Sequence, residues 1–375
     1  MANGTAGGTG RLIVAKVGSS TLTDASGAPD RAFIASLCDQ AARLVARGDR
    51  VVIVSSGAVA AGMERLRLPE RPIELPVIQA CSAAGQAALT EVYAEALEAH
   101  GIPCGQVLLT RGDVLGRTSY LNIRNTFDAL LDLGVVPVVN ENDTVSPTEV
   151  TFGENDMLGA IVSTLVGADL YVILSDVDGL HEADPSRVPG SPLVGRVSRV
   201  DGDVLAMAGR TASRVGTGGM ASKVRAGRAM LSAGIPMVIC AGREPDVLVR
   251  VASGEPVGTR FEAEGDVHEA PRKLWIGIAG MSRGSVVVDR GAERVLLEDG
   301  ASLLPVGVRE VEGDFSEGDV VSVLNAGGDL IARGLSRYDA DDLRRCAGLR
   351  LDVIGRFMPD KADQPAIHRD ELLVF

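Results

Sequence analysis

One stretch of the chain combines glycines, hydroxyls and a lysine in a spacing suited to binding phosphate. It reads Gly216-Thr217-Gly218-Gly219-Met220-Ala221-Ser222-Lys223 and precedes a predicted helix. Glycines let backbone N–H groups approach an anion closely, and the start of a helix carries partial positive charge. The lysine adds a full charge where phosphate oxygens would lie. The stretch is not a P-loop, because the G-x-x-x-x-G-K-[ST] pattern occurs nowhere in the chain.

A second lysine lies in a similar setting near the start of the chain. Lys16 ends an apolar run and is followed by Gly18, Ser19 and Ser20. Two lysines on two glycine turns predict a clamp that holds a transferring phosphoryl group from both ends. For either lysine alone, an ordinary glycine turn with a solvated ammonium group explains the pattern equally well.

Two polar clusters follow other apolar runs. Ser55-Ser56-Gly57 would offer backbone amides and a hydroxyl to a carboxylate or phosphate, although a serine N-cap is an alternative. Asn140-Glu141-Asn142-Asp143 would place carboxylates and amides at the same edge. A carboxylate there could hold a substrate ammonium group, and an exposed loop is the alternative.

The run Gly153-Glu154-Asn155-Asp156 opens a predicted helix. Acidic residues in a first helical turn are usually explained by capping and by the helix dipole. The functional alternative is that Asn155 donates a hydrogen bond to the substrate while Asp156 holds the two lysines in register. A carboxylate between two ammonium groups would keep them charged and oriented.

Ser175 and Asp176 follow a further apolar run and could meet the ribose or base of a nucleotide, whereas Asp178-Gly179 is interpreted as a structural turn. The four histidines form no metal-spaced pair, so the metal ligands are unknown. No G-x-S-x-G elbow and no H-R-D or D-F-G set is present. The inventory therefore lacks a strong general base. Phosphorylating a carboxylate needs none, because that nucleophile is already ionised at neutral pH.

The elements that position these clusters alternate between strand and helix. Continuous apolar strands between helices indicate a mostly parallel sheet covered on both faces, and ligands bind such sheets beyond the carboxyl ends of the strands. Each polar cluster comes just after a strand. The predicted strands are Leu12–Val17, Arg50–Ser55, Gln106–Thr110, Val135–Asn140, Leu170–Ser175 and Pro236–Ala241. The predicted helices are Arg31–Arg47, Val77–His100, Ile123–Leu133, Asp156–Val166 and Ala221–Ala233.

After Ser253 the pattern changes to short β-type runs broken by Gly-Asp and Gly-Gly turns, which is typical of a small barrel. These runs are Lys273–Ile278, Ser285–Asp289, Ser302–Leu304, Val308–Val311 and Val320–Leu324. The chain of 375 residues is therefore expected to form two domains. The predicted limits are a flexible N-terminus at 1–10, an α/β domain at 11–253, a linker at 254–271, a β-barrel-like domain at 272–356 and a loosely attached tail at 357–375.

The net charge of −13 argues against broad binding to nucleic acid or anionic membranes. Five scattered cysteines without a C-x-x-C pair fit reduced thiols better than a disulfide framework or a zinc site. The first ten residues are polar and glycine-rich, unlike a signal peptide, and no apolar run reaches the length of a membrane span. The protein is expected to be soluble and cytoplasmic, without a membrane partner.

Taken together, the motifs resemble the amino acid kinase family, and within it the members that phosphorylate L-glutamate. The C-terminal part resembles the PUA domain attached to many bacterial members, through Ser302-Leu303-Leu304-Pro305 and Gly334-Leu335-Ser336-Arg337-Tyr338. The likeness extends through nearly the whole chain. The motifs that carry it are Lys16-x-Gly18-Ser19-Ser20, Ser55-Ser56-Gly57-Ala58, Asn140-Glu141-Asn142-Asp143, Gly153-Glu154-Asn155-Asp156 and Thr217-Gly218-Gly219-Met220-Ala221-Ser222-Lys223.

The resemblance implies ATP-dependent phosphorylation of the glutamate side-chain carboxylate, the first step of proline biosynthesis, with Mg²⁺. It implies that Lys16 and Lys223 contact the ATP phosphates and that Asp156 organises them. Family members have Thr-Asp where this chain has Ser175-Asp176, so a hydroxyl is kept, and Ala221 is a mild local variant. Glutamate would be bound by Ser56, Asp143 and Asn155. ATP would be bound by Lys16, Ser175, Asp176, Thr217, Gly218, Gly219, Met220, Ala221, Ser222 and Lys223.

Similar enzymes form homo-oligomers and are inhibited by proline, so both are expected here, and hand-off of the labile product to glutamyl phosphate reductase is a further hypothesis. An RNA-binding role of the PUA-like part is the rival from another class. The run from Arg272 to Arg356 has no excess of basic residues, so RNA is not the expected partner. N-acetylglutamate kinase is the rival within the enzyme class. Its substrate lacks the ammonium group that would meet Asp143.

Overall fold

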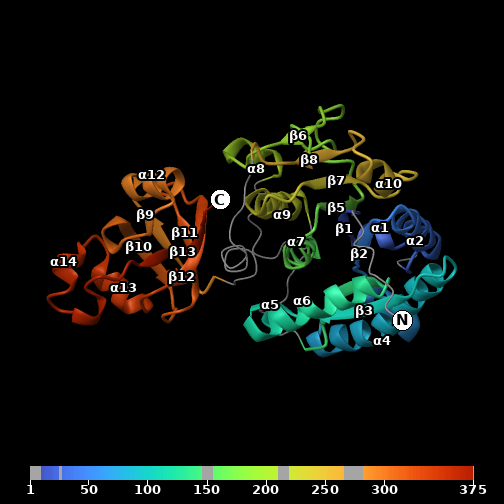
Figure 1. Ribbon diagram of the computed structural model, residues 1–375, viewed down its shortest axis with the longest axis horizontal. Coiled ribbons are helices and arrows are strands. Elements are labelled where there is room, and N and C mark those ends of the chain that lie inside the picture. Colours follow the sequence, from blue (N-terminus) through green and yellow to red (C-terminus); the bar gives the residue numbers. More distant parts are fainter. Residues whose placement is uncertain are drawn as a thin grey trace, which may run out of the picture. The chain divides into compact units, whose positions relative to one another are not determined.

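The computed structural model describes residues 10–24, 28–115, 117–145, 155–209, 219–265 and 282–374. The chain divides into two compact units, Met1–Asp266 and Val267–Phe375 (Figure 1). Each unit has its own sheet and its own buried core. The predicted limits 1–10, 11–253, 254–271, 272–356 and 357–375 remain predictions, apart from two segments considered below.

The first unit is built on an eight-stranded sheet in which neighbouring strands are parallel, except for one antiparallel pair near an edge. Three of its strands are buried along their whole length, which explains their continuous apolar sequence. The predicted fold class is thus confirmed. In spatial order the strands are β3 (Cys104–Leu109), β4 (Val136–Glu141), β2 (Arg50–Val54), β1 (Leu12–Val17), β5 (Leu170–Ser175), β7 (Met237–Ala241), β8 (Thr259–Phe261) and β6 (Arg196–Val197).

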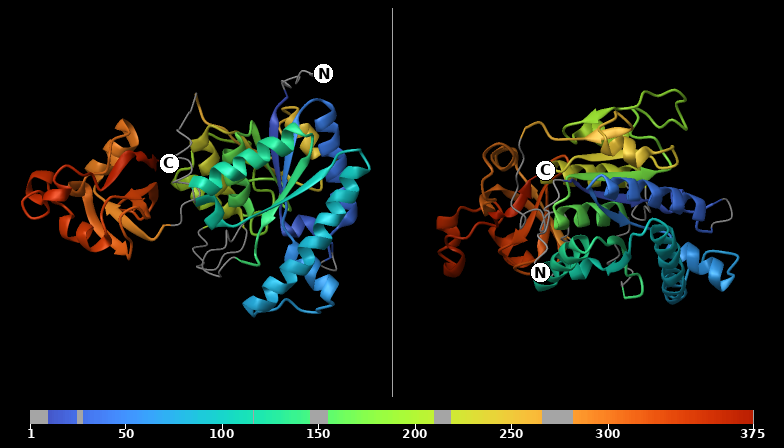
Figure 2. Two further views of the ribbon diagram at one scale, coloured as in Figure 1. Left: turned by 60° about the horizontal axis from the view of Figure 1, so that its bottom comes forward. Right: turned by 45° about the vertical axis from the view of Figure 1, so that its right-hand side comes forward.

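Helices cover both faces of this sheet, and one buried hydrophobic core lies under one of these helical layers. Figure 2 shows the helices from two further directions. The helices of that layer are α2 (Arg31–Ala46), α3 (Ala58–Leu66), α4 (Leu75–Glu98) and α10 (Val247–Ala252). The other layer contains α6 (Arg117–Asp132), α7 (Asn155–Val166) and α9 (Met220–Ala233). Shorter helices are α1 (Ser19–Leu22), α5 (Arg111–Leu115) and α8 (Gly202–Met207).

Helices α3 and α4 pack side by side with their backbones in close approach (Figure 2). A Cβ atom on Gly85 would lie 1.9 Å from the backbone oxygen of Ala58, and a Cβ atom on Gly62 would lie 1.8 Å from that of Cys81. Only glycine fits at either position. Because Ala58 starts α3 directly after the β2 turn, this packing holds α4 against the carboxyl end of β2.

Gly85→Ala is therefore expected to lower the free energy of unfolding by about 1–3 kcal/mol, because the added methyl group must push the two backbones apart. Gly202→Ala is the matched control, since nothing lies within 4 Å of a Cβ atom there and α8 can accept alanine. Urea unfolding of both variants measures the difference. Equal stability of the two variants would contradict the close packing.

The second unit contains a five-stranded sheet whose neighbours are antiparallel, except for the parallel pair of β9 with β11. Its core is separate from that of the first unit. In spatial order the strands are β10 (Val308–Gly313), β9 (Gly284–Val288), β11 (Val320–Leu324), β12 (Leu330–Ser336) and β13 (Ile367–Val374). The helices are α12 (Arg290–Asp299), α13 (Ala340–Cys346) and α14 (Leu351–Ile354), with 3-10 turns at Pro305–Gly307 and Pro359–Lys361.

Two expectations about segments between and after the domains were wrong. Residues Ile367–Val374 of the predicted tail form β13, which pairs with β12 and buries Leu372 and Leu373. Within the predicted linker, Thr259–Phe261 forms β8 and pairs with β7, because Phe261 is fully buried against the sheet. The predicted strand Ser302–Leu304 is reduced to one bridge, between Leu303 and Ile367. The predicted strand Lys273–Ile278 lies outside the described residues.

Candidate active site

The alternation of strand β1 directs Lys16 away from the core that lies under α2. Ala15 and Val17 belong to that core, under the layer that contains α2. Successive side chains of a strand point to opposite faces, so Lys16 faces the layer that contains α7. Its side chain is only 7% exposed. A lysine buried at the carboxyl end of a central strand requires an anionic partner nearby.

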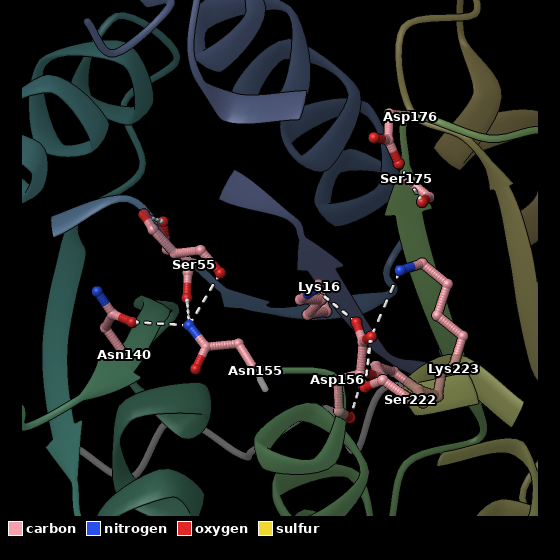
Figure 3. Close-up of polar contacts among 11 residues, drawn as sticks. Lys16, Ser55, Asn140, Asn155, Asp156, Ser175, Asp176, Ser222 and Lys223 are labelled. Carbon is pink, nitrogen blue, oxygen red and sulfur yellow. Dashed lines mark hydrogen bonds and ion pairs between the residues drawn. The ribbon is translucent and has the colours of Figure 1, made fainter. Parts of the chain in front are cut away.

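That partner is Asp156, in the first turn of α7 (Figure 3). The Lys16 ammonium group donates to Oδ1 of Asp156 at 2.5 Å. The hydroxyl of Ser222 donates to Oδ2 at 2.9 Å, and Nζ of Lys223 lies 3.5 Å from the same oxygen. Lysines that are 207 positions apart in the chain therefore meet at one carboxylate that is 1% exposed.

The charges of this cluster stabilise one another. Burial alone would raise the pKa of the Asp156 carboxyl, but the ammonium groups of Lys16 and Lys223 outweigh burial and lower it below its usual value. The hydrogen bonds from Lys16 and Ser222 act in the same direction. Asp156 is thus an ionised carboxylate at neutral pH, and it holds the ammonium groups of Lys16 and Lys223 near the carboxyl end of β1.

Helix α9 supplies Ser222 and Lys223 from its first turn, where the backbone dipole adds partial positive charge. Figure 3 shows the Lys223 side chain extended between Asp156 and the Ser175–Asp176 pair. Gly219, Met220 and Ala221 form the start of this helix. Thr217 and Gly218, predicted to bind ATP, lie outside the described residues.

Tyr171 of β5 holds the start of α7 in place through a hydrogen bond. Its hydroxyl donates to the backbone oxygen of Asp156 at 2.8 Å, and its ring is fully buried in β5. A Cβ atom on Gly159 would lie 2.2 Å from that hydroxyl, so the glycine makes the contact possible. Burial, and then the nearby Asp156 charge, raise the pKa of Tyr171 well above its usual value, so the phenol keeps its proton and remains a donor.

Asn155 joins the ends of two other strands (Figure 3). Its amide nitrogen lies 2.7 Å from the backbone oxygen of Ser55, 2.9 Å from Oγ of Ser56 and 3.1 Å from Oδ1 of Asn140. Ser55 and Ser56 follow β2, and Asn140 lies at the end of β4. Because Asn155 and Asp156 are consecutive, this polar group adjoins the lysine cluster.

Asp143 lies beyond the end of β4, and Ser82 of α4 donates to its Oδ2 at 2.6 Å. Burial raises the pKa of the Asp143 carboxyl, against the opposing effects of the Ser82 hydrogen bond and the Arg71 charge. A raised pKa in a partly buried carboxylate shows that its positive partners do not fully offset the cost of burial. A bound ammonium group would supply that charge.

Ser175 and Asp176 lie at the end of β5. The Ser175 hydroxyl donates to Oδ1 of Asp176 at 3.0 Å. Partial burial tends to raise the pKa of Asp176, but hydrogen bonds from Ser175 and Ser20 and the charge of Lys223 lower it. Asp178, interpreted as a structural turn residue, accepts a hydrogen bond from Nε2 of His181, three positions further on, at 2.8 Å.

The model of the amino acid kinase family matches residues 11–241 of this sequence. The chain belongs to the amino acid kinase family. The model of the PUA domain matches residues 284–357. Relatives that align over nearly the full length are glutamate 5-kinases. The one from Myxococcus xanthus is 47% identical over 97% of this chain and 96% of its own, and the one from Methylobacillus flagellatus is 43% identical over 97% and 98%.

A solved structure of the carbamate kinase from Giardia lamblia bound to AMP-PNP shares the fold of this amino acid kinase. Its TM-score is 0.50 at 16% identity, and the match covers 68% of this chain and all of that one. At that identity the likeness concerns the fold alone. Within the described ranges, no helix has the length and apolar composition needed to cross a bilayer.

The predicted site residues that the structure describes lie at or beyond the carboxyl ends of β1, β2, β4 and β5 and at the starts of α7 and α9. Sequence reasoning missed Ser82 and Gln86 on α4 and Tyr171 on β5. The sequence could have indicated the role of Tyr171, because a tyrosine in an otherwise aliphatic buried strand needs a hydrogen-bond partner for its hydroxyl. Ser82 and Gln86 gave no such signal within an alanine-rich helix.

Proposed function

We propose that this protein transfers the γ-phosphoryl group of ATP to the side-chain carboxylate of L-glutamate. The product is L-glutamyl 5-phosphate, and the reaction is the first step of proline biosynthesis. The observation that carries the proposal is the pair of lysines from β1 and α9 that meet at the Asp156 carboxylate. The identity of 43–47% to glutamate 5-kinases over almost the whole chain supports glutamate as the acceptor.

In the proposed mechanism the lysines act on the charge of the transferring group. Phosphoryl transfer between two anions is hindered by their repulsion and by charge that spreads over the equatorial oxygens. Lys16 and Lys223 would stabilise that charge from two sides, and Asp156 would keep both ammonium groups oriented. The acceptor carboxylate is already ionised at neutral pH, so no residue has to remove a proton.

The acceptor subsite would consist of Ser56, Asp143 and Asn155. Asp143 would pair with the ammonium group of free glutamate, which offsets the cost of burying its carboxylate. Ser56 and Asn155, which already contact each other at 2.9 Å, would donate to substrate oxygens. An acetylated amine carries no charge for Asp143, so this subsite favours glutamate over N-acetylglutamate.

The nucleotide would occupy the neighbouring edge, between Ser175, Asp176 and the stretch from Thr217 to Lys223. The described residues contain no group of three His, Cys, Asp or Glu side chains placed to hold a metal ion. Mg²⁺ commonly binds through substrate phosphates and only one or two carboxylates. We therefore propose that Mg²⁺ enters as its complex with ATP, with the phosphate oxygens as its main ligands.

A hydroxylamine trap tests the activity. The full chain is incubated with Mg·ATP, hydroxylamine and either L-glutamate or N-acetyl-L-glutamate. Hydroxylamine displaces phosphate from an acyl phosphate and leaves a stable hydroxamate. Formation of the hydroxamate from glutamate alone is expected. Formation from N-acetylglutamate alone, or from neither compound, would contradict the proposal.

Asp143→Ala is expected to raise the KM for glutamate by about 10- to 100-fold, which corresponds to the loss of one charge-assisted contact. The KM for ATP should change little, because Asp143 lies on the acceptor side. Steady-state kinetics with each substrate varied in turn measures the two constants. An unchanged KM for glutamate would remove Asp143 from the subsite.

Further proposals extend those made from the sequence. We propose that the kinase domain begins at residue 11 and extends through β8, and that the PUA domain extends through β13. We also propose a homo-oligomer, a cytoplasmic location and hand-off of the product to glutamyl phosphate reductase. Glutamyl phosphate cyclises readily, so direct transfer would protect it. Sizing by light scattering tests the oligomer, and co-purification with the reductase under mild conditions tests the hand-off.

A further inference from the structure

Helix α4 carries two buried polar side chains one turn apart, Ser82 and Gln86, with exposed fractions of 2% and 7%. Buried polar groups of a helix normally bond to their own backbone or to another element. Thr90, one turn further on, donates to the Gln86 backbone oxygen at 2.8 Å. The Gln86 amide nitrogen also donates to Oγ1 of Thr90, at 3.3 Å. The Ser82 hydroxyl and the Gln86 amide oxygen, in contrast, bond to residues that follow or end strand β4.

The contact of Ser82 with Asp143 is short and involves a charge. The distance of 2.6 Å between Oγ and Oδ2 is typical of a hydroxyl that donates to an ionised carboxylate. The positive charge of Arg71, in the loop between α3 and α4, also acts on Asp143 and lowers its pKa. The hydroxyl engages one carboxylate oxygen and thereby sets the orientation of the carboxylate.

Gln86 acts on Asn155 through Asn140. Its Oε1 accepts from Nδ2 of Asn140 at 2.8 Å, which fixes which way the Asn140 amide points. The Oδ1 of Asn140 is then directed to Asn155, at 3.1 Å, and to the backbone N–H of Glu141, at 2.9 Å. Without Gln86 the Asn140 amide could turn over, and Asn155 would face a donor in place of an acceptor.

The packing of α4 keeps both side chains at this position. Gly85, between Ser82 and Gln86 in sequence, meets the backbone at Ala58, which follows the Ser55–Ser56 turn. The same helix surface therefore sits close to the β2 turn and contacts residues at the end of β4. Asp156, in contrast, is contacted by Lys16 of β1 and by Ser222 and Lys223 of α9.

We propose that Ser82 and Gln86 are positioning residues of the acceptor subsite, which act through Asp143 and through Asn140 and Asn155. This inference rests on the proposed function, because it assigns these contacts to glutamate binding. Helix α4 then affects the affinity for the acceptor and does not take part in nucleotide binding, which involves α9 and the end of β5.

The test uses two variants of the full chain with two matched controls. Ser82→Ala is compared with Ser163→Ala, where a serine buried in α7 bonds only locally to the Gly159 oxygen. Gln86→Met is compared with Gln40→Met, where a glutamine buried in α2 accepts from the Leu248 N–H of α10. Each pair removes the same polar group from a buried helix position.

Ser82→Ala and Gln86→Met are expected to raise the KM for glutamate about tenfold and to change the KM for ATP less than about twofold. Both controls should leave the two constants near the wild-type values. Because the Ser82 hydrogen bond lowers the pKa of Asp143, its loss should also shift the acid limb of kcat/KM for glutamate to higher pH. A general loss of stability would not move that limb.

The outcomes separate the two proposals. If the wild-type chain forms no hydroxamate from glutamate, the proposed function fails and the positioning roles fail with it. If the wild type is active but the α4 variants match their controls, only the positioning roles are wrong. Equal increases in the KM for ATP and for glutamate would likewise overturn them, because the effect would then not belong to the acceptor side.

Discussion

Lys223→Ala is expected to lower kcat by about 10²- to 10³-fold, the usual loss when one group that stabilises transition-state charge is removed. Lys16→Ala should have an effect of similar size from the other side of the phosphoryl group. The fold should persist, because Asp156 retains one ammonium partner in either variant. Steady-state kinetics gives kcat, and circular dichroism tests the fold.

Lys361→Ala provides the matched control, since Lys361 is a buried lysine of the second unit and pairs with Glu317 at 2.8 Å. Its loss removes a comparable buried ammonium group from the second unit and leaves the Asp156 cluster of the first unit intact, so kcat should stay close to the wild-type value. Near-normal turnover in both Lys16→Ala and Lys223→Ala would rule out the clamp. A large loss in Lys361→Ala would show that the assay reports on stability and not on chemistry.

Asp156→Asn is expected to affect both stability and activity. It would leave two ammonium groups at a buried position without their carboxylate, which costs about 3–5 kcal/mol when a partner of a buried ion pair is removed. The turnover should fall by about 10²-fold or more, because the lysines lose the group that orients them. Urea unfolding and steady-state kinetics at neutral pH measure the two effects.

The pH dependence of this stability has a defined sign. The pKa of Asp156 lies below its usual value of 3.8 in the folded chain, so its ionisation stabilises the fold at pH values above 3.8. This contribution is lost as the pH falls through the lowered value. The gap in stability between the wild type and Asp156→Asn should therefore narrow in strong acid. A gap that widens on acidification would contradict the assignment.

The sequence predicted the central strands because burial on both faces leaves a continuous apolar run. Strands β1 and β5 have the predicted bounds, and helix α9 begins one residue early. Strand β13 was missed because its charged residues interrupt the apolar pattern, although Leu372 and Leu373 are buried. Strands β6 and β8 have two and three residues, too few for any periodicity.

The candidate site was predictable where its residues follow strands. Lys16 lies near the end of the apolar strand β1, and that position singles it out. Asn155 and Asp156 open helix α7, where capping is a competing explanation for polar residues. The direction of each contact was not predictable, because it depends on tertiary packing. Ser82 contacts Asp143 because α4 packs closely on α3 at Gly85. This packing joins two separate helices, so the pattern of neither helix alone predicts the contact.

The contact between Gly159 and Tyr171 also depends on tertiary packing and could not be predicted from the sequence. A glycine within a helix costs about 1 kcal/mol relative to alanine and so suggests a reason in packing, but it does not name the partner. Here the partner is the Tyr171 hydroxyl, which bonds to the backbone of Asp156 and so helps to place its carboxylate.

A crystal structure with a non-hydrolysable ATP analogue and L-glutamate tests the clamp most directly. Nζ of Lys16 and Nζ of Lys223 should both lie within about 3.2 Å of oxygens of the terminal phosphoryl group, on opposite sides of it. If either nitrogen points into a different cavity, or lies too far away to reach that group, two-sided stabilisation of the transferring phosphoryl group is wrong.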